Sequence, residues 1–125
     1  HFKYGTKIGN KYLTHLRVGR SFLNSHRFVT GLSDNEICPK CTENKTENID
    51  HFVMSCPAYS LPRALLIHKV TLLISNFSSF GKKQQLYILL NGVNTNNNIY
   101  DCRNVPIMFA MQNYILSTKR FEKQP

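Results

Sequence analysis

Three cysteines and one histidine lie within nineteen residues of this chain, in the segment CPKCTENKTENIDHFVMSC that spans residues 38–56. Their spacing is Cys-x2-Cys-x9-His-x4-Cys, and the residues are Cys38, Cys41, His51 and Cys56. A Cys-x2-Cys pair lets two thiolates reach one ion from a tight turn, and three cysteines with one histidine form a standard structural zinc set. The spacing therefore predicts one zinc ion, and it requires a fold in which the two pairs meet.

Disulfides, and free or redox-active thiols, stay open beside zinc as roles for these cysteines. Four cysteines allow two bridges, although the clustering leaves Cys102 as the one distant partner. A redox Cys-x2-Cys pair follows a strand and precedes a helix, whereas acids and asparagines follow Cys41 here. We favour zinc binding as the role of the clustered cysteines. We expect Cys102 to be an ordinary half-buried cysteine outside the site.

Four protein ligands of this kind fill the coordination sphere, whereas a catalytic zinc keeps one position open for water. The sequence also shows no Ser-His-Asp set, no paired carboxylate set and no phosphate-binding glycine loop. We therefore expect a structural zinc and no catalysis by this chain alone, with a stand-alone zinc hydrolase as the least favoured function. The acids around the zinc segment are interpreted as a solvated loop: Asp34, Glu36, Glu43, Glu47 and Asp50.

Glycine, proline and small polar residues divide the chain into helical segments. Gly19 interrupts a pattern that would otherwise place Arg20 and Arg27 on an apolar stripe, and Gly31 ends the second segment. We expect N-caps at Ser21, Asn48 and Ser60. The predicted helices cover residues 11–18, 22–28, a short stretch within 48–56, 60–75, 82–90 and a last helix that has Pro106 in its first turn and runs to about 120.

These helices are predicted to form one domain over residues 1–125 that is mainly α, with few or no strands, and is stabilised by one structural zinc site. The zinc segment covers about 34–57 and a helical tail about 60–121, while residues 121–125 are expected to fray. No apolar run approaches the roughly 20 residues that a membrane span needs. The expected inward residues are Tyr12, Leu13, Leu16, Leu65, Leu66, Val70, Leu73, Ile74, Met108, Met111, Tyr114 and Ile115.

Positive charge is unevenly distributed along the chain. The net charge is +9, and residues 1–33 carry six bases and no acid, whereas residues 34–50 carry five acids and two bases. A positive field of this kind attracts polyanions, of which nucleic acid is the commonest. The charge alone does not separate a nucleic-acid-binding protein from a basic protein with a solvated surface.

Beyond the zinc ligands, the order of several short motifs resembles a known family. The stretches are LTHLRVGRSFLNSHRFVTGLSDNEICPKC, then ENIDHFVMSCPAYSLPR, and finally LYILLNGVNTNNNIYDCRNVPIMFAMQNYILSTKRF. They are similar to the region that follows the polymerase in non-LTR, LINE-type retrotransposon proteins of the jockey-like group. The resemblance spans about residues 13–121. It implies the C-terminal zinc-binding region of a reverse transcriptase, with the metal positions at Cys38, Cys41, His51 and Cys56.

The resemblance also carries expectations about context. The chain would be a piece of a longer polyprotein whose polymerase domain is an RNA-directed DNA polymerase and a packing partner. It would work in the nucleus and in cytoplasmic ribonucleoprotein particles, with no membrane attachment. The acidic catalytic motif of the polymerase is absent here, and so are the endonuclease motifs. The Cys-x2-Cys-x9-His-x4-Cys spacing is longer than that of the compact retroviral knuckle, which leaves direct reading of bases in doubt.

Two functions follow from these expectations. In the first, the module binds element RNA or target DNA, through phosphate contacts from Lys11, Arg17, Arg20, Arg27 and Lys40. Aromatic side chains could stack on unpaired bases there, although core positions are the more frequent role for Phe22, Phe28 and Tyr59. In the second, the module is structural and packs against the polymerase. A domesticated copy with a host role is a further alternative.

Overall fold

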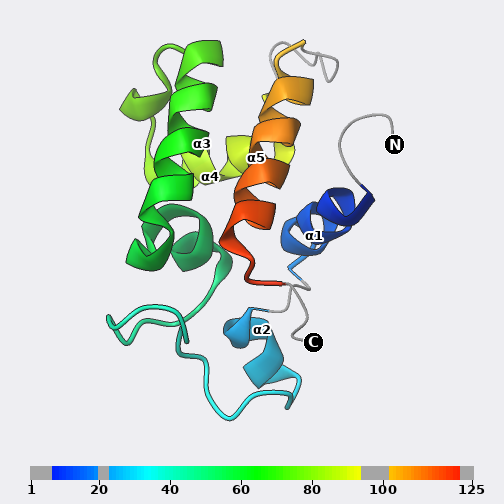
Figure 1. The fold of residues 1–125 in the computed structure, drawn as a ribbon, viewed down its shortest axis with the longest axis vertical. Coiled ribbons are helices and arrows are strands. Elements are labelled where there is room, and N and C mark those ends of the chain that lie inside the picture. The colour runs from blue at the N-terminus through cyan, green and yellow to red at the C-terminus, as the bar shows by residue number, and fades with distance from the viewer. Residues whose placement is uncertain (1–6, 20–22, 94–101, 122–125) are drawn as a thin grey trace.

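Helices dominate the computed structural model, which describes residues 7–19, 23–93 and 102–121 (Figure 1). Within these ranges the one β-type pairing is an isolated antiparallel bridge between Ile37 and Thr46. The mainly α prediction is therefore confirmed. The elements are α1 (Lys7–Arg17), α2 (Asn24–Val29), the π-helix η1 (His51–Ser55), the 3-10 helix η2 (Pro57–Tyr59), α3 (Ser60–Leu73), the 3-10 helix η3 (Phe77–Ser79), α4 (Lys82–Asn91) and α5 (Asn104–Thr118).

Helix α5 is the centre of the packing, because it contacts α3, α1 and α4 (Figure 1). Its buried side chains include Met111, Tyr114 and Ile115, each at most 2% exposed. Helix α2 and the loop that leads to η1 lie at the lower end of this group in the view of Figure 1. None of the described helices is both long enough and apolar enough to cross a bilayer.

The glycine punctuation predicted from the sequence is confirmed. Gly19 has φ +73° two residues after the end of α1, and Gly31 has φ +80° two residues after the end of α2, so both occupy the left-handed region that favours glycine. Helix α1 begins at Lys7, four residues before the expected start. Asn10 in this added turn accepts a 2.7 Å hydrogen bond from Gln112 of α5, which ties the turn to the central helix. Ser21, the expected cap of the second helix, lies outside the described residues.

Two expectations about α3 are wrong. Ser60 is the first residue of the helix rather than its N-cap, because the 3-10 turn Pro57–Tyr59 leads straight into it. Leu65 is 63% exposed instead of inward, and the core face of this helix carries Leu66 and Val70. The other residues expected inward are buried or partly buried against the core.

The segment after α5 is ordered further than expected. Lys119 turns the chain with φ +56°, and the Phe121 ring then packs against the rings of Tyr12 and Phe52, with centroids 5.3 Å and 5.4 Å away. The expected fraying is therefore wrong for Phe121, and residues 122–125 lie outside the described part. This packing brings the C-terminal segment to the zinc-segment end of the domain.

Candidate metal centre

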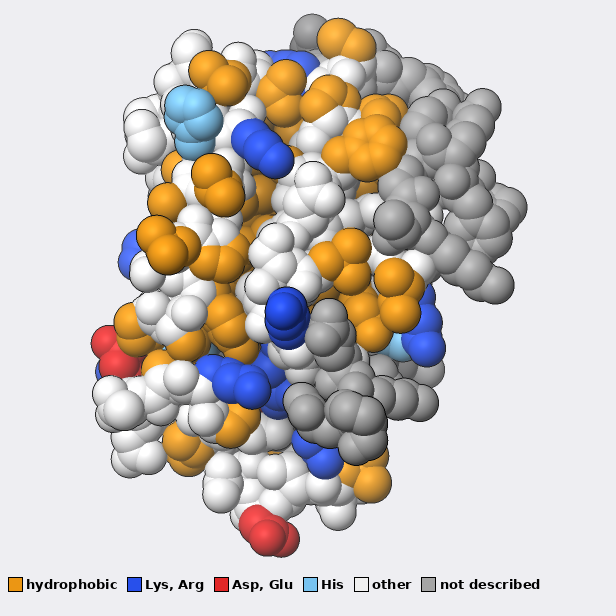
Figure 2. All heavy atoms as spheres, viewed as in Figure 1, with side chains coloured by type: hydrophobic (Ala, Val, Ile, Leu, Met, Phe, Trp, Pro, Cys, Tyr) orange, Lys and Arg blue, Asp and Glu red, His pale blue; other side chains and the backbone are white. Residues whose placement is uncertain are grey.

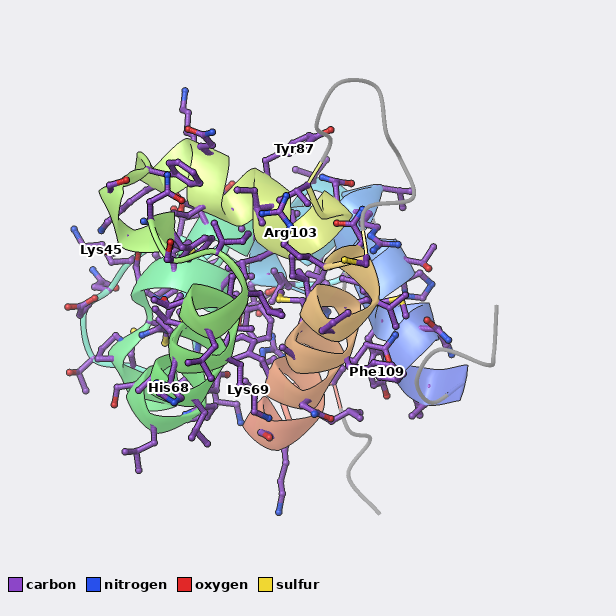
Figure 3. All side chains as sticks on the ribbon, turned by 90° about the horizontal axis from the view of Figure 1, so that it is seen from above. Lys45, His68, Lys69, Tyr87, Arg103 and Phe109 are labelled. Carbon is purple, nitrogen blue, oxygen red and sulfur yellow. The ribbon has the colours of Figure 1, made fainter. Side chains whose placement is uncertain are left out.

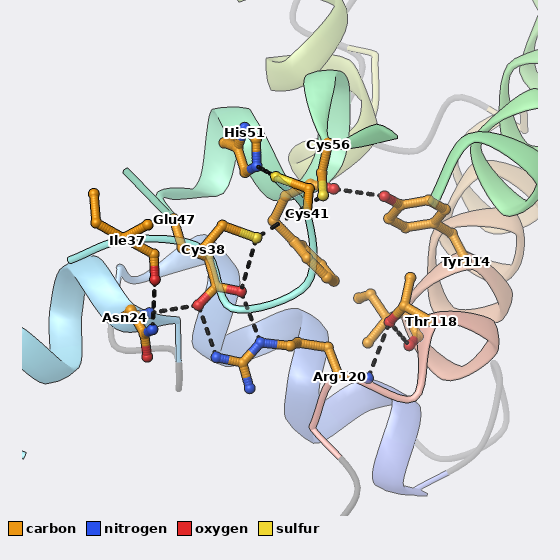
Figure 4. Close-up of polar contacts among 12 residues, drawn as sticks. Asn24, Ile37, Cys38, Cys41, Glu47, His51, Cys56, Tyr114, Thr118 and Arg120 are labelled. Carbon is orange, nitrogen blue, oxygen red and sulfur yellow. Dashed lines mark hydrogen bonds and ion pairs between the residues drawn. The ribbon is translucent and has the colours of Figure 1, made fainter. Parts of the chain in front are cut away.

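The four predicted ligands converge on one point (Figure 4). Their sulfur and ring-nitrogen atoms all lie within 4.8 Å of one another. The Sγ atoms of Cys38 and Cys56 are 3.9 Å apart, and Cys41 Sγ is 3.5 Å from His51 Nε2. A tetrahedral ion with metal–sulfur bonds of about 2.3 Å would place two sulfur atoms about 3.8 Å apart, and a sulfur and a nitrogen atom about 3.5 Å apart. The arrangement is thus compatible with one metal ion.

A tight turn positions the first two ligands. The Ile37–Thr46 bridge and a 2.9 Å hydrogen bond from Cys38 N to Lys45 O bring the two arms of the loop together. Burial raises the pKa of Cys38, and the backbone groups of Lys40 and Cys41 in the turn act in the opposite direction. The turn itself therefore favours the thiolate, which is the ligand form of Cys38.

A π turn positions the other two ligands. Cys56 N donates a 2.7 Å hydrogen bond to His51 O, which spans five residues instead of the four of an α-helix. In an α-helix, residues five apart point about 140° away from each other, whereas the i to i+5 hydrogen bond of a π turn brings the two residues closer to the same side. The wider turn therefore directs His51 and Cys56 to the same ion. The sequence predicted a short helix here, but not this geometry.

Polar contacts hold the π turn in place. Asn48 Oδ1 accepts a 2.8 Å hydrogen bond from His51 N, as expected for an N-cap residue. At the other end, Arg63 of α3 donates to the carbonyls of Val53 and Cys56, at 3.0 Å and 2.5 Å. Tyr114 of α5 donates a 2.5 Å hydrogen bond to Phe52 O. The carbonyls of the turn are thus anchored to α3 and α5.

Burial controls the chemistry of the thiols. Cys38 is 3% exposed and Cys56 is fully buried. Burial raises the pKa of Cys56 to about 12 and also raises the pKa of Cys38, to which the nearby Glu47 charge adds. Without an ion these thiols are neutral at pH 7, and a bound cation would displace their protons. Cys102 is exposed rather than half-buried as expected, and it does not belong to the cluster.

Glu47 is a member of the site that the sequence did not reveal. Its side chain is 0% exposed, so the interpretation of a solvated acidic loop is wrong at this position. Arg120 binds both carboxylate oxygens, each at 2.7 Å, and Asn24 N donates a further 2.7 Å hydrogen bond (Figure 4). Glu47 Oε2 is also 4.0 Å from Cys38 Sγ. One carboxylate therefore joins α2, the metal loop and the segment after α5.

Arg120 is almost as well enclosed as its partner, because its side chain is 11% exposed. The hydrogen bond to Glu47 raises the pKa of Arg120, and burial opposes this in part. The pair is bidentate and sits beside the candidate metal ligands. A buried charge pair of this kind is costly to break, because either partner alone would remain desolvated.

The described residues predicted to contact nucleic acid lie on α1, on α2 and in the metal loop. Lys11 is exposed on α1, and Lys40 is exposed in the turn between the first two ligands. Arg17 Nε donates to Leu90 O at the end of α4, and Arg27 Nη2 donates to Leu32 O at 3.2 Å. Arg20 lies outside the described residues. The two described arginines therefore stabilise backbone carbonyls in the folded chain.

The aromatic residues that could stack on bases differ in their exposure. Tyr59 is 5% exposed and packs edge-on against Phe52, so its ring belongs to the core. Phe28 is 45% exposed on α2. Phe22 lies outside the described residues. Of the described candidates, Phe28 alone has a ring open enough to stack on a base.

Comparisons with protein-family models, with curated proteins and with solved structures found no match. The family resemblance therefore rests on the sequence motifs alone. The convergence of the four ligands, in contrast, is a property of this chain's own geometry.

Proposed function

We propose that this chain is a non-catalytic zinc-binding module of a retrotransposon reverse transcriptase that binds element RNA or target DNA through its basic surface. The observation that carries the proposal is the convergence of Cys38, Cys41, His51 and Cys56 on one point. Three sulfurs and one nitrogen form a standard structural zinc set, and two of the donor pairs lie at the separations that a tetrahedral zinc would give them. The family resemblance and the excess of bases supply the nucleic-acid part.

The structural role of the zinc follows from the number of ligands. Four protein ligands leave no open position, so the ion would hold the loop 38–50 against η1 and activate no water. Nuclease, protease and primer-extension assays on the purified chain with zinc should therefore show no turnover. A point variant such as His51→Ala is the matched control. A reproducible signal that disappears in this variant would contradict a purely structural zinc.

The charge distribution supports a polyanionic partner. Residues 51–100 contain no aspartate or glutamate, and neither do residues 102–121. Most of the chain's acids instead lie in the zinc segment, where Glu47 is already paired with Arg120. The remaining surface is left with an excess of positive charge, which favours phosphate contacts.

Salt dependence tests this nucleic-acid role. If about four phosphates are neutralised, the log–log slope of affinity against salt should be roughly −3 to −4. The double variant Lys11→Gln, Lys40→Gln should flatten the slope by roughly one unit for each lost contact, with little change in sequence preference. Both lysines are exposed, so the fold should survive. The measurement is fluorescence anisotropy with single-stranded RNA and with duplex DNA across a salt series.

Lys69→Gln is the matched control for that series, because Lys69 is an exposed lysine on α3, far along the chain from both tested positions. It should leave the slope within experimental error of the parent. An unchanged slope in the double variant, with metal still bound, would count against the proposed contacts. If the parent chain binds neither RNA nor DNA at any salt concentration tested, the nucleic-acid role is refuted.

A structural module that packs against the polymerase is the second candidate function. The hydrogen bonds of Arg17 and Arg27 to carbonyls favour it, because these two arginines then contribute to the fold rather than to a free phosphate-binding surface. It predicts that the isolated chain binds neither RNA nor DNA in a salt-dependent way. A domesticated copy with a host function could show either result, so this experiment does not separate it from the other two functions.

A further inference from the structure

Helix α3 is apolar on two opposite sides. Its core side carries Leu66 and Val70, which are at most 2% exposed. On the opposite side Leu61, Leu65 and Leu72 are 80%, 63% and 74% exposed. A helix that is hydrophobic all round is normally buried all round, so the second face needs a cover.

The exposed residues have a spacing against which another helix can pack. Leu61, Leu65, His68 and Leu72 are separated by four, three and four residues. This is the alternating spacing of the seam positions in a coiled coil, and at 100° per residue the four lie within a sector of about 60°. The sequence did not predict this stripe, because Leu65 was expected to face the core.

A shallow groove runs beside this stripe, between α3 and α5. It is lined by Lys69, Leu72 and Leu73 from α3 and by residues of α5 that include Phe109 and Ala110. His68, Lys69 and Phe109 all lie on this side of the molecule (Figure 3). Figure 2 shows hydrophobic side chains spread over this face, with lysine or arginine side chains among them. Two helices and a groove between them form a seat for a third helix.

Charge decides which helix fits. Helices α3 and α5 contain no aspartate or glutamate, and Lys69 of α3 is the cation that lines the groove. A second copy of this chain would offer Lys69 no carboxylate from α3 or α5, so self-association through this face gains no charge pairing. A helix with acidic residues beside its apolar stripe would instead be complementary to Lys69.

We propose that the groove between α3 and α5, together with the Leu61, Leu65 and Leu72 stripe, docks an acidic amphipathic helix of another protein. The leucines would fill the seam, and Lys69 would pair with a carboxylate at its rim. This surface is separate from Lys11 and Lys40, so the inference does not depend on the nucleic-acid role. It concerns protein recognition only.

A pair of synthetic peptides tests the proposal. One is a three-heptad helix with leucine at the seam positions and glutamate beside them, and its twin has lysine in place of each glutamate. Both are used below the concentration at which they self-associate. By fluorescence anisotropy the glutamate peptide should bind at least about tenfold more tightly than its twin, because only the former complements Lys69.

Variants of the chain locate the binding. The double variant Leu65→Gln, Leu72→Gln should lower the affinity for the glutamate peptide by about tenfold or more, since two apolar contacts are lost. Val29→Gln with Leu32→Gln is the matched control, because these residues are 77% and 66% exposed outside α3 and α5, and it should bind like the parent. Lys69→Glu should reduce or reverse the preference between the two peptides. Circular dichroism checks that each variant keeps its helices.

Four results would overturn the proposal. They are absence of saturable binding by the glutamate peptide, equal binding of both peptides, equal loss in the tested and control pairs, and a concentration-dependent dimer in sedimentation equilibrium that the Leu65→Gln, Leu72→Gln variant abolishes. Vesicles containing phosphatidylserine form a separate arm. Vesicle binding that depends on these leucines, without peptide binding, would assign the face to lipid instead.

Discussion

Removal of the metal should leave this domain largely unfolded at room temperature. Metal binding is coupled to folding because the four ligands do not meet in the unfolded chain, and a domain of this size has only about 5–15 kcal/mol of stability in total. A chelator should therefore cost several kcal/mol. Thermal melting followed by circular dichroism, with and without chelator, measures the loss, and elemental analysis should give one zinc per chain.

Two serine substitutions serve as the matched pair for that experiment. Cys56→Ser removes a buried ligand and should reproduce most of the chelator effect, while Cys102→Ser changes an exposed cysteine outside the cluster and should be neutral. Similar behaviour of the two variants would contradict the ligand assignment. So would a stoichiometry near zero in protein purified without chelator, or an X-ray absorption spectrum without a metal–sulfur shell.

Replacement of Glu47 by glutamine should lower the free energy of unfolding by about 3–5 kcal/mol. The reason is that Arg120, only 11% exposed, would keep a buried charge without its bidentate partner. Urea unfolding measures the effect. Zinc content should stay at one per chain in the folded variant, because the carboxylate lies beside Cys38 and does not belong to the four-ligand cluster.

Glu43→Gln is the natural control, since Glu43 is an exposed acid in the same loop. Its effect should fall within about 0.5 kcal/mol. A double variant with Glu47→Gln and Arg120→Met should recover part of the loss, because the stranded charge is then gone. Equal stability of the Glu47→Gln and Glu43→Gln proteins would show that the ion pair contributes nothing to the fold.

The parts of this structure that were predictable are those that depend on near neighbours in sequence. Cys38, Cys41, His51 and Cys56 lie within nineteen residues, and their spacing alone indicated that they meet. Gly19 and Gly31 fixed the ends of two helices, because a left-handed backbone favours glycine wherever the chain turns. The helical character followed from apolar periodicity.

The parts that escaped prediction depend on distant residues. Glu47 resembles its acidic neighbours in the sequence, and what distinguishes it is Arg120, 73 positions away. Leu65 fits the apolar pattern of α3 as well as Leu66 does, so periodicity could not decide which of them faces the core. The π turn at His51 was hidden for another reason, since its extra residue is stabilised by Arg63 and Tyr114 contacts that no local pattern shows.

The sequence separations of these contacts also predict an order of events during folding. The outermost ligands are 18 positions apart in the sequence, whereas the Glu47–Arg120 pair joins residues 73 positions apart and the Tyr12–Phe121 contact joins residues 109 positions apart. The entropy lost on closing a loop grows with its length, so the short loop is the easiest to close. On a ribosome, moreover, residue 120 is made after every other element described here. The metal loop can therefore take shape first, and Arg120 and Phe121 then lock it to the helices.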